Sequence, residues 1–323
     1  MTDVLVRDLK ASDAAALADL FRRCYGETYG TRLFYDTKAL VAAINECRLR
    51  SVVAQIDGRI VGHTGITVVH QGSLVCETGN TVVDPEMRGR GLLKLLGGGL
   101  RERVLRDGFI GYVHYPTTAH EIMQRSSVSG SGVETGLMLA YVPDTTVYTA
   151  VETRSGRIAV TVVYQPFIAA PARAVYVPAR YADLLRSIYA KSDLQRSFRS
   201  GAPQWDAASD LLVSSKPDRG LLNVLVTSAA ADLADVVRTH VDRSPAAVVH
   251  VDLPMTAAWL DAGVEALIGA GCFFCALLPE FERCDLLRMQ FLRRPLSEDF
   301  APDVINADAK GLLKLIRHEA GLI

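Results

Sequence analysis

The sequence has few cysteines and almost no net charge. Lysine and arginine together number 35 and aspartate and glutamate 36, so the formal charge of -1 gives no overall attraction to polyanions. We therefore expect no nucleic-acid partner. The six cysteines are too sparse in 323 residues for the disulfide framework of a small secreted domain, and they lie in apolar contexts at Cys24, Cys47, Cys76, Cys272, Cys275 and Cys284.

Long apolar runs are also missing. No stretch reaches the length of a transmembrane helix, and Met1–Asp8 carries acids where a signal peptide has a basic stretch and then an apolar run. We therefore expect a cytoplasmic protein with no membrane partner. Hydrophobic residues at 49% and charged residues at 22% match globular proteins, which excludes wholesale disorder.

One pair of cysteines has the spacing of a redox or zinc motif. The pair is Cys272-Phe-Phe-Cys275, and it lacks both a second pair and nearby histidines. The two phenylalanines between the cysteines favour a buried strand. We expect no metal site in this chain.

The first half of the sequence alternates strand and helix signals in a definite order. A strand is followed by two helices, three strands, a helix, a strand, a short helix and a strand. Asp57-Gly58 is a strong hairpin signal between two of the strands, and Pro85 ends the third strand of that meander. The expected strands are 4–6, 51–56, 60–69, 74–83, 109–114 and 135–141, and the helices contain 16–21, 40–47, 92–106 and 119–125.

Turn-forming residues between 142 and 158 suggest two domains, 1–150 and 151–323. The second half again mixes helices and strands, while the polar residues 192–209 indicate a loop. We expect an α/β (α+β) fold with a mixed, mostly antiparallel central sheet flanked by helices in each lobe. The expected elements of the second half are strands at 221–226, 248–253, 272–277 and 286–292 and helices at 181–189, 257–268 and 307–318.

The most informative segment is 82–92, where a strand ends, the chain passes through glycines and a helix begins. The first amides of a helix lack partners inside it, and they bind anions together with the positive end of the helix dipole. Gly89 and Gly91 would let phosphate oxygens approach the backbone, and Arg88 and Arg90 add charge. The segment has neither the P-loop nor the complete Rossmann pattern. The alternative is an ordinary basic turn.

The segment and the order of elements around it resemble the GCN5-related N-acetyltransferase (GNAT) superfamily over about residues 3–142. In that family an [RQ]xxGx[GA] loop after the fourth strand holds the pyrophosphate of acyl-CoA. Arg88-Gly-Arg-Gly91 supplies its first four positions, whereas Leu93 stands where glycine or alanine is usual. The resemblance implies that acetyl-CoA, or another acyl-CoA, is the cofactor. It assigns the pyrophosphate to Arg88, Gly89, Arg90, Gly91 and Leu92.

The resemblance also implies how the cofactor and acceptor react. It places the pantetheine arm along the strand edge at 80–83, where the amide of Val82 or Val83 would polarise the thioester. Family members often carry a catalytic glutamate on this strand, and Glu77 stands there as the candidate base. The alternative for Glu77 is a solvent-facing carboxylate or an ion pair.

The remaining proton carriers are less clear from the sequence. His114 and His120 flank the expected acyl site, and either is a further candidate base that ranks below Glu77. The alternative is a structural role, which is the more common one for a lone histidine. The tyrosine that many relatives use to protonate the CoA thiolate is absent from 119–125. Ser126 or Ser127, or water, would then return the proton.

The second half looks like the degenerate second lobe of a tandem acetyltransferase, because no counterpart of Arg-Gly-Arg-Gly occurs there. The expected activity is acyl transfer from acyl-CoA to a primary amine of a small molecule. Alternatives are a non-catalytic acyl-CoA sensor or interaction module, or transfer to a hydroxyl or a carrier-protein thiol. A homodimer stays open. Aromatic residues that either line the acceptor pocket or belong to the core are Tyr25, Tyr29, Phe34 and Tyr35.

Overall fold

The computed structural model describes residues 3–68, 70, 72–146, 156–200, 203–297 and 300–322. Its strands are β1 (Leu5–Asp8), β2 (Arg50–Ile56), β3 (Arg59–Thr67), β4 (Val75–Val83), β5 (Gly111–His114), β6 (Val133–Val142), β7 (Ile158–Pro166), β8 (Arg173–Tyr176), β9 (Arg196–Arg199), β10 (Asp210–Lys216), β11 (Leu221–Ser228), β12 (Val248–Pro254), β13 (Phe273–Leu278) and β14 (Leu286–Leu292). The α-helices are α1 (Ala14–Tyr25), α2 (Thr37–Asn45), α3 (Leu92–Arg106), α4 (Glu121–Val128), α5 (Ala182–Lys191), α6 (Leu233–Arg243), α7 (Leu260–Gly269) and α8 (Ala307–Glu319).

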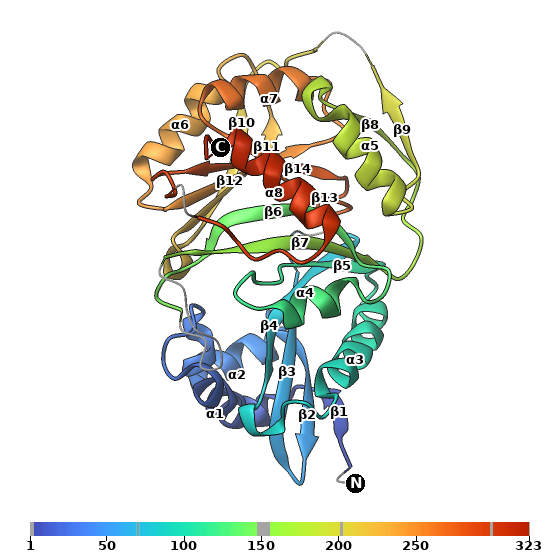
Figure 1. The fold of residues 1–323 in the computed structure, drawn as a ribbon, viewed down its shortest axis with the longest axis vertical. Coiled ribbons are helices and arrows are strands. Elements are labelled where there is room, and N and C mark those ends of the chain that lie inside the picture. Colours follow the sequence, from blue (N-terminus) through green and yellow to red (C-terminus); the bar gives the residue numbers. More distant parts are fainter. Residues whose placement is uncertain are drawn as a thin grey trace.

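Both halves of the chain contribute to one long sheet. Its strand order is β1-β2-β3-β4-β5-β7-β6-β13-β14-β12-β11-β10, and its pairs are antiparallel except β4 with β5 and β11 with β12. The expected mixed, mostly antiparallel α/β fold is confirmed. In Figure 1 the strands β6 and β7 cross the middle of the molecule, between the first half below and the second half above.

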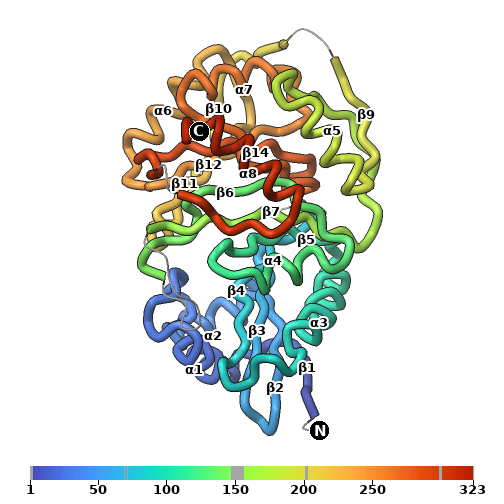
Figure 2. Tube along the Cα trace, in the orientation of Figure 1, coloured from blue at the N-terminus to red at the C-terminus, as the bar shows by residue number. Residues whose placement is uncertain are grey.

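The helices of the first half cover both faces of its strands. Val53 packs in a cluster with α1 and α2, whereas its neighbour Val52 packs in a cluster with α3. Successive side chains of a strand point to opposite faces, so the two groups of helices lie on opposite sides of the sheet. Figure 2 shows the N-terminal end near β1 and the C-terminal end near α8, far apart in the molecule.

The hairpin between β2 and β3 forms where the sequence predicts it. Asp57 and Gly58 both adopt positive φ, at 47° and 81°. This is the conformation that a two-residue hairpin with the twist of its strands requires.

The second half repeats the strand order of the first. In chain order β4, α3, β5, α4, β6 and β7 correspond to β11, α6, β12, α7, β13 and β14. The pairing orders β4-β5-β7-β6 and β11-β12-β14-β13 are also the same, and each begins with a parallel pair. The two sets meet where Gly136 of β6 pairs with Ala276 of β13.

The structure differs from the sequence prediction at one expected loop and near the expected domain boundary. The prediction of a continuous loop at 192–209 is wrong. Residues 196–199 form β9, which pairs with β8 in a separate two-stranded sheet. The strand β7 follows the expected boundary at 150, yet it pairs between β5 and β6 of the first half. The boundary itself falls within 147–155, outside the described residues.

The three glycines at 97–99 do not interrupt α3. A Cβ atom at Gly99 would lie 2.5 Å from Cγ1 of Val6, so only glycine lets β1 approach the helix this closely. Close packing therefore accounts for this glycine.

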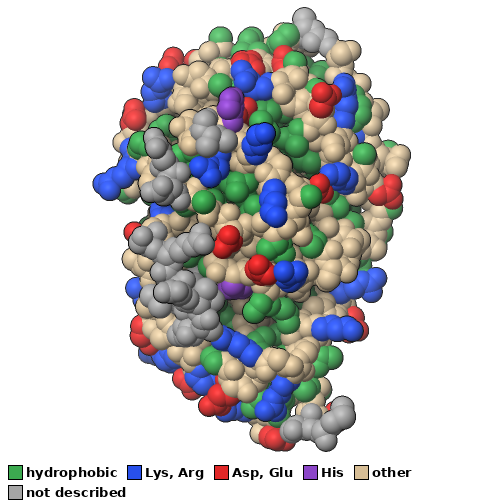
Figure 3. All heavy atoms as spheres, viewed as in Figure 1, with side chains coloured by type: hydrophobic (Ala, Val, Ile, Leu, Met, Phe, Trp, Pro, Cys, Tyr) green, Lys and Arg blue, Asp and Glu red, His purple; other side chains and the backbone are tan. Residues whose placement is uncertain are grey.

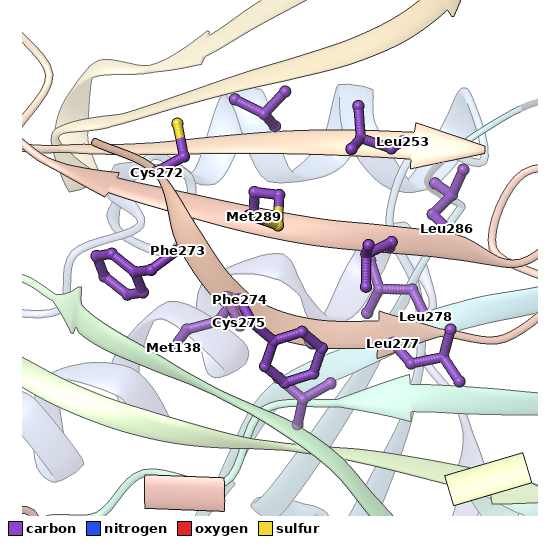
Figure 4. Packing of buried hydrophobic residues seen from close by; sticks show 14 of the residues in the cluster. Met138, Leu253, Cys272, Phe273, Phe274, Cys275, Leu277, Leu278, Leu286 and Met289 are labelled. Carbon is purple, nitrogen blue, oxygen red and sulfur yellow. The ribbon is translucent and has the colours of Figure 1, made fainter. Parts of the chain in front are cut away.

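The core of the second half contains the cysteine pair. Figure 4 shows Cys272 just before β13 and Cys275 on that strand, among Phe273, Phe274 and Met289. None of the six cysteines forms a disulfide with a described residue. Burial raises the pKa of Cys272 to about 12 and also raises that of Cys275, so both stay protonated at neutral pH. The pair behaves as apolar core.

The surface agrees with the near-zero net charge. On the face shown in Figure 3, basic and acidic side chains are interspersed, without a broad region of one sign. Among the described residues, no helix combines the length and apolar character needed to span a membrane.

Candidate functional site

The strands β4 and β5 separate beyond a short paired region. Their parallel pairing ends at Thr78 with His114, where β5 stops, while β4 continues to Val83. The edge of β4 that faces β5 is therefore not covered by β5 from Gly79 onward. An extended ligand can pair with such an edge as an added strand.

A bulge lies where β4 leaves β5. Asn80 has φ +54°, and the register of β4 with β3 shifts between His63 and Gly65. The conformation is held from both sides, because the Asn80 carbonyl lies 2.8 Å from His63 Nδ1 and Tyr29 Oη donates to Asn80 Oδ1 at 2.7 Å. The bulge is a fixed feature of the strand.

A buried carboxylate anchors the loop that follows β4. Asp84 Oδ2 accepts from Arg23 Nε at 2.8 Å and from Arg59 Nη2 at 2.7 Å, and Oδ1 accepts from the Glu86 amide at 3.1 Å. These bonds tie the loop to α1 and to the β2–β3 hairpin. Pro85 then begins a single 3₁₀ turn, and the chain reaches the glycines in a defined direction.

The backbone amides of the glycine loop are open. Within the described chain, no protein acceptor receives a hydrogen bond from the amides of residues 88–93. Gly89 and Gly91 have φ of +76° and +74°, and a Cβ atom at either would meet no atom within 4 Å. The turn therefore leaves a row of donors at the start of α3, beside free space that an anion can fill.

The two arginines of this loop are also available. Arg88 and Arg90 are exposed, and neither forms an ion pair with any described residue. The charge of Arg88 reaches His120, where burial first and then Arg88 lower the histidine's pKa. The loop and the start of α4 thus lie on the same side of the site.

A cavity of about 470 Å³ opens between the separated strands. It brings together four of the expected residues, Glu77, His114, His120 and Ser126. Leu93, which follows the glycine loop in α3, lines it too, whereas Val82, Val83 and residues 88–92 lie outside its lining. The cavity and the loop are thus neighbours along α3.

Glu77 is a partly buried residue of β4 whose strand partners are Thr67 and Val113. The described structure contains no ion pair of Glu77 with a basic side chain. Its charge acts on Tyr115 and Arg219, which also line the cavity. Glu77 therefore lines the cavity without an ion-pair partner among the described residues.

The two histidines are neutral at pH 7. Burial lowers the pKa of His114 to about 4, and burial and Arg88 lower that of His120. Both shifts favour the neutral imidazole, and a lowered pKa also makes each ring a weaker base.

The two serines of α4 differ. The Ser127 hydroxyl donates to the Met123 carbonyl one turn earlier, so it is occupied by the helix. Ser126 is exposed at the cavity, and its carbonyl accepts from Ser129 Oγ.

The expected aromatic residues divide between pocket and core. Tyr25 and Tyr29 line the cavity, whereas Phe34 is 1% exposed and stacks on Phe21. The Tyr35 hydroxyl accepts from the Tyr29 amide at 2.9 Å and so supports the pocket from behind.

The second half of the chain supplies one wall of the cavity, which the sequence does not predict. The residues 216–219, at the end of β10 and in the turn before β11, line the cavity together with residues of β4. Arg219 donates to Thr31 Oγ1 at 3.0 Å and to Tyr141 Oη at 3.3 Å. Nothing in the local sequence around Arg219 distinguishes it from a surface arginine, because its neighbours in space lie far away along the chain.

The corresponding place in the second half is closed by protein groups. The turn from β11 into α6 occupies the position that the glycine loop has before α3. There the Ala229 amide donates to Asp206 Oδ2 at 2.9 Å, and the Ala230 amide donates to Ser209 Oγ at 2.9 Å. Trp259 Nε1 also donates to Asp206 Oδ2, at 2.8 Å. A carboxylate of the chain itself thus fills the place of an anion.

Several solved structures resemble about half of this chain. The ribosomal-protein-S18-alanine N-acetyltransferase from Escherichia coli has a TM-score of 0.42 and 16% identity, and the match covers 52% of this chain and 97% of that one. The putative acetyltransferase yncA from Salmonella typhimurium, solved with acetyl-CoA, has a TM-score of 0.42 and 17% identity over 53% and 98% of the two chains. The PaiA N-acetyltransferase from Thermoplasma acidophilum, in complex with coenzyme A, has a TM-score of 0.37 and 13% identity over 51% and 99%.

The comparison with curated proteins gives no match. A family model does match the first half, over residues 14–119, which run from the start of α1 to the segment before α4. The matched family is the acetyltransferase (GNAT) family. The matched segment includes the glycine loop and the separated strands β4 and β5, so the similarity of this chain to the family lies in its first half.

Proposed function

We propose that this protein binds acetyl-CoA at the start of α3 and transfers the acetyl group to a primary amine of a small molecule. The observation that carries the proposal is the row of open amides at 88–93, beside glycines with free space and next to the uncovered edge of β4. These donors fit a diphosphate, which prefers backbone amides at a helix start. When bound, acetyl-CoA supplies an acetyl group whose C–S bond is replaced by a C–N bond to the acceptor, leaving the CoA thiol.

The glycine loop and β4 bind different parts of the cofactor. Arg88, Gly89, Arg90, Gly91 and Leu92 hold the pyrophosphate, the arginines by charge and the others by their amides. The amides of Val82 and Val83 orient the arm and the thioester along the strand edge. A short acyl group suits a cavity that also has to admit the acceptor.

Glu77 acts as the base that removes a proton from the attacking amine, directly or through water. Its place in the cavity, with no basic ion-pair partner among the described residues, leaves the carboxylate available to accept a proton. His120 is a second, weaker candidate acceptor of that proton, because it lines the same cavity and burial and Arg88 lower its pKa. Ser126, which is exposed and lines the cavity, would return a proton to the thiolate.

The division of the chain into a catalytic first lobe and a degenerate second lobe is part of this proposal. The first lobe takes in residues 1–150 together with β7, which completes its sheet, and the second lobe follows. Asp206 and Ser209 occupy two amides of the corresponding turn, those of Ala229 and Ala230, so we expect one cofactor per chain.

The test is a measurement of acetyl-CoA binding followed by mass spectrometry of products from a panel of amines, alcohols and thiols. Binding together with an acetylated amine supports the proposal. Binding without any transfer would identify a sensor, and an ester or thioester product would change the acceptor class. No binding of acetyl-CoA would reject the cofactor site itself.

A further inference from the structure

The cavity has a charged wall that the acetyl-transfer chemistry does not require. Arg219 lies at the end of the 3₁₀ turn Pro217–Arg219 and reaches from the second half toward the first. Its side chain meets two neutral oxygens, those of Thr31 and Tyr141, and its guanidinium lies 5.8 Å from the centre of the Tyr141 ring. Among the residues that the structure describes, Arg219 forms no ion pair with a carboxylate.

A partly buried guanidinium without a carboxylate partner is unusual, because burying a charge is costly unless it is paired. Burial acts to lower the pKa of Arg219, but Tyr141, Tyr29 and Glu77 outweigh it and raise the pKa overall, so the charge is retained. The guanidinium has five N–H donors, and its two bonds to protein oxygens leave others for a ligand.

The other charged groups of the cavity complete the pattern. Glu77 lies on β4, while Lys216, Asp218 and Arg219 lie on the turn of the second half. Lys216 and Asp218 are exposed, so solvent screens them more than it screens Arg219. The cavity therefore presents a carboxylate from β4 and a guanidinium from the turn of the second half. A small molecule with an amine at one end and a carboxylate at the other matches both.

We infer that the acceptor carries a carboxylate that Arg219 binds, so that the substrates of this protein are amino acids or similar small amino-carboxylates. The inference rests on the proposed function for the reaction itself. It deepens that function by assigning the second lobe a role in acceptor recognition. Arginine suits this role because its planar fork binds a carboxylate through two parallel hydrogen bonds.

The experiment compares leucine, phenylalanine and methionine, each with its amide and its decarboxylated amine, as acceptors at a fixed saturating concentration of acetyl-CoA. We expect the free acids to have the lowest KM. Arg219→Gln should raise the KM of the acids roughly tenfold or more, because a charge-assisted hydrogen bond is lost, and should leave that of the amides and amines nearly unchanged. Arg219→Lys should retain part of the preference.

A matched control is Arg238→Gln, which removes one positive charge from an exposed position of α6 that does not line the cavity. It should leave every KM as in the wild type. A thermal melt of each variant shows whether the loss of the contacts to Thr31 and Tyr141 alters the fold. Equal KM values for acids and amides in the wild type, or an equal rise for both in Arg219→Gln, would overturn the inference.

A binding measurement separates this inference from the reaction. Calorimetry of the same acids and amides with the CoA-loaded protein needs no turnover. Tighter binding of an acid than of its amide, lost in Arg219→Gln, supports the carboxylate site even if no acetylated product forms, in which case only the proposed reaction fails. Acetylation of amines without any preference for the acids would reject the carboxylate site and leave the reaction standing.

Discussion

The carboxylate of Asp206 accepts a hydrogen bond from the Ala229 amide at 2.9 Å, at the turn that corresponds to the glycine loop of the first half. In the first half the equivalent turn has open amides and two glycines with positive φ. One fold unit thus occurs twice, with its anion site open in one copy and filled by a side chain in the other. The proposed function consequently assigns binding to the first copy and leaves the second free to shape the acceptor side.

The first prediction concerns the glycine loop. Gly91→Val should weaken acetyl-CoA binding roughly tenfold or more, because a branched side chain at φ +74° strains the turn and fills the space an anion needs. Calorimetry should give one site per wild-type chain. Gly108→Val is the control, since Gly108 also has positive φ and free space but lies at the far end of α3. Equal affinity for Gly91→Val and the wild type would remove the loop from the cofactor site.

The second prediction concerns the base. Glu77→Gln should lower turnover most at low pH, where the amine acceptor is protonated and has to lose a proton, and least at high pH, where the amine is already neutral. The measurement is a pH profile of kcat/KM for the variant and the wild type. Glu102→Gln, an equal charge change at an exposed position of α3, should follow the wild type. A Glu77→Gln profile that does the same would exclude Glu77 as the base.

Local patterns in the sequence predict part of this fold because the physics behind them is local. Asp57-Gly58 fixes a hairpin, and the glycines at 89 and 91 fix a turn, from their own backbone preferences. The strand at 196–199 escaped prediction because it is short and largely exposed, so it lacks an alternating apolar pattern.

The acceptor wall is a different case. Arg219 and Thr31 are separated by 188 positions, and only the pairing of the two halves in one sheet brings them within 3.0 Å. The same pairing requires glycine at 136, where a Cβ atom would lie 2.3 Å from the Ala276 Cβ. The local sequence around Arg219 or Gly136 does not indicate which distant residue it contacts. The sequence therefore predicts the cofactor loop but not the residues of the second half that line the cavity.

The third prediction concerns acid stability. His63 is fully buried, and burial lowers its pKa from the usual 6.5 to about 4, so the folded protein keeps it neutral while the unfolded chain takes up a proton below pH 6.5. Stability is therefore lost as the pH falls through this range, and His63 contributes about 2 kcal/mol of that loss between pH 7 and 5. Urea unfolding at both pH values should show a smaller loss for His63→Gln than for the wild type.

The control for this prediction is the exposed His318. His318→Gln should show the same loss of stability between pH 7 and 5 as the wild type. A loss for His63→Gln as large as that of the wild type would mean that other groups cause the acid sensitivity.

The fourth prediction concerns the ion pair beneath the junction of the halves. Arg288 donates to Asp252 through Nε and Nη2, both at 2.7 Å, and through Nη1 to Met138 Sδ at 3.6 Å. Both charged residues are buried. Asp252→Asn should lower the free energy of unfolding by about 3–5 kcal/mol, because it leaves a buried guanidinium without its counter-charge.

A second variant separates charge from packing. Replacing both partners, Asp252→Leu with Arg288→Met, removes the buried charges and should recover most of the stability that Asp252→Asn loses. Unfolding of the two variants and the wild type in guanidinium chloride measures these differences in the free energy of unfolding. If the double variant is as unstable as Asp252→Asn, the pair matters through its hydrogen-bonded geometry across β12, β14 and β6, and the charge argument is wrong.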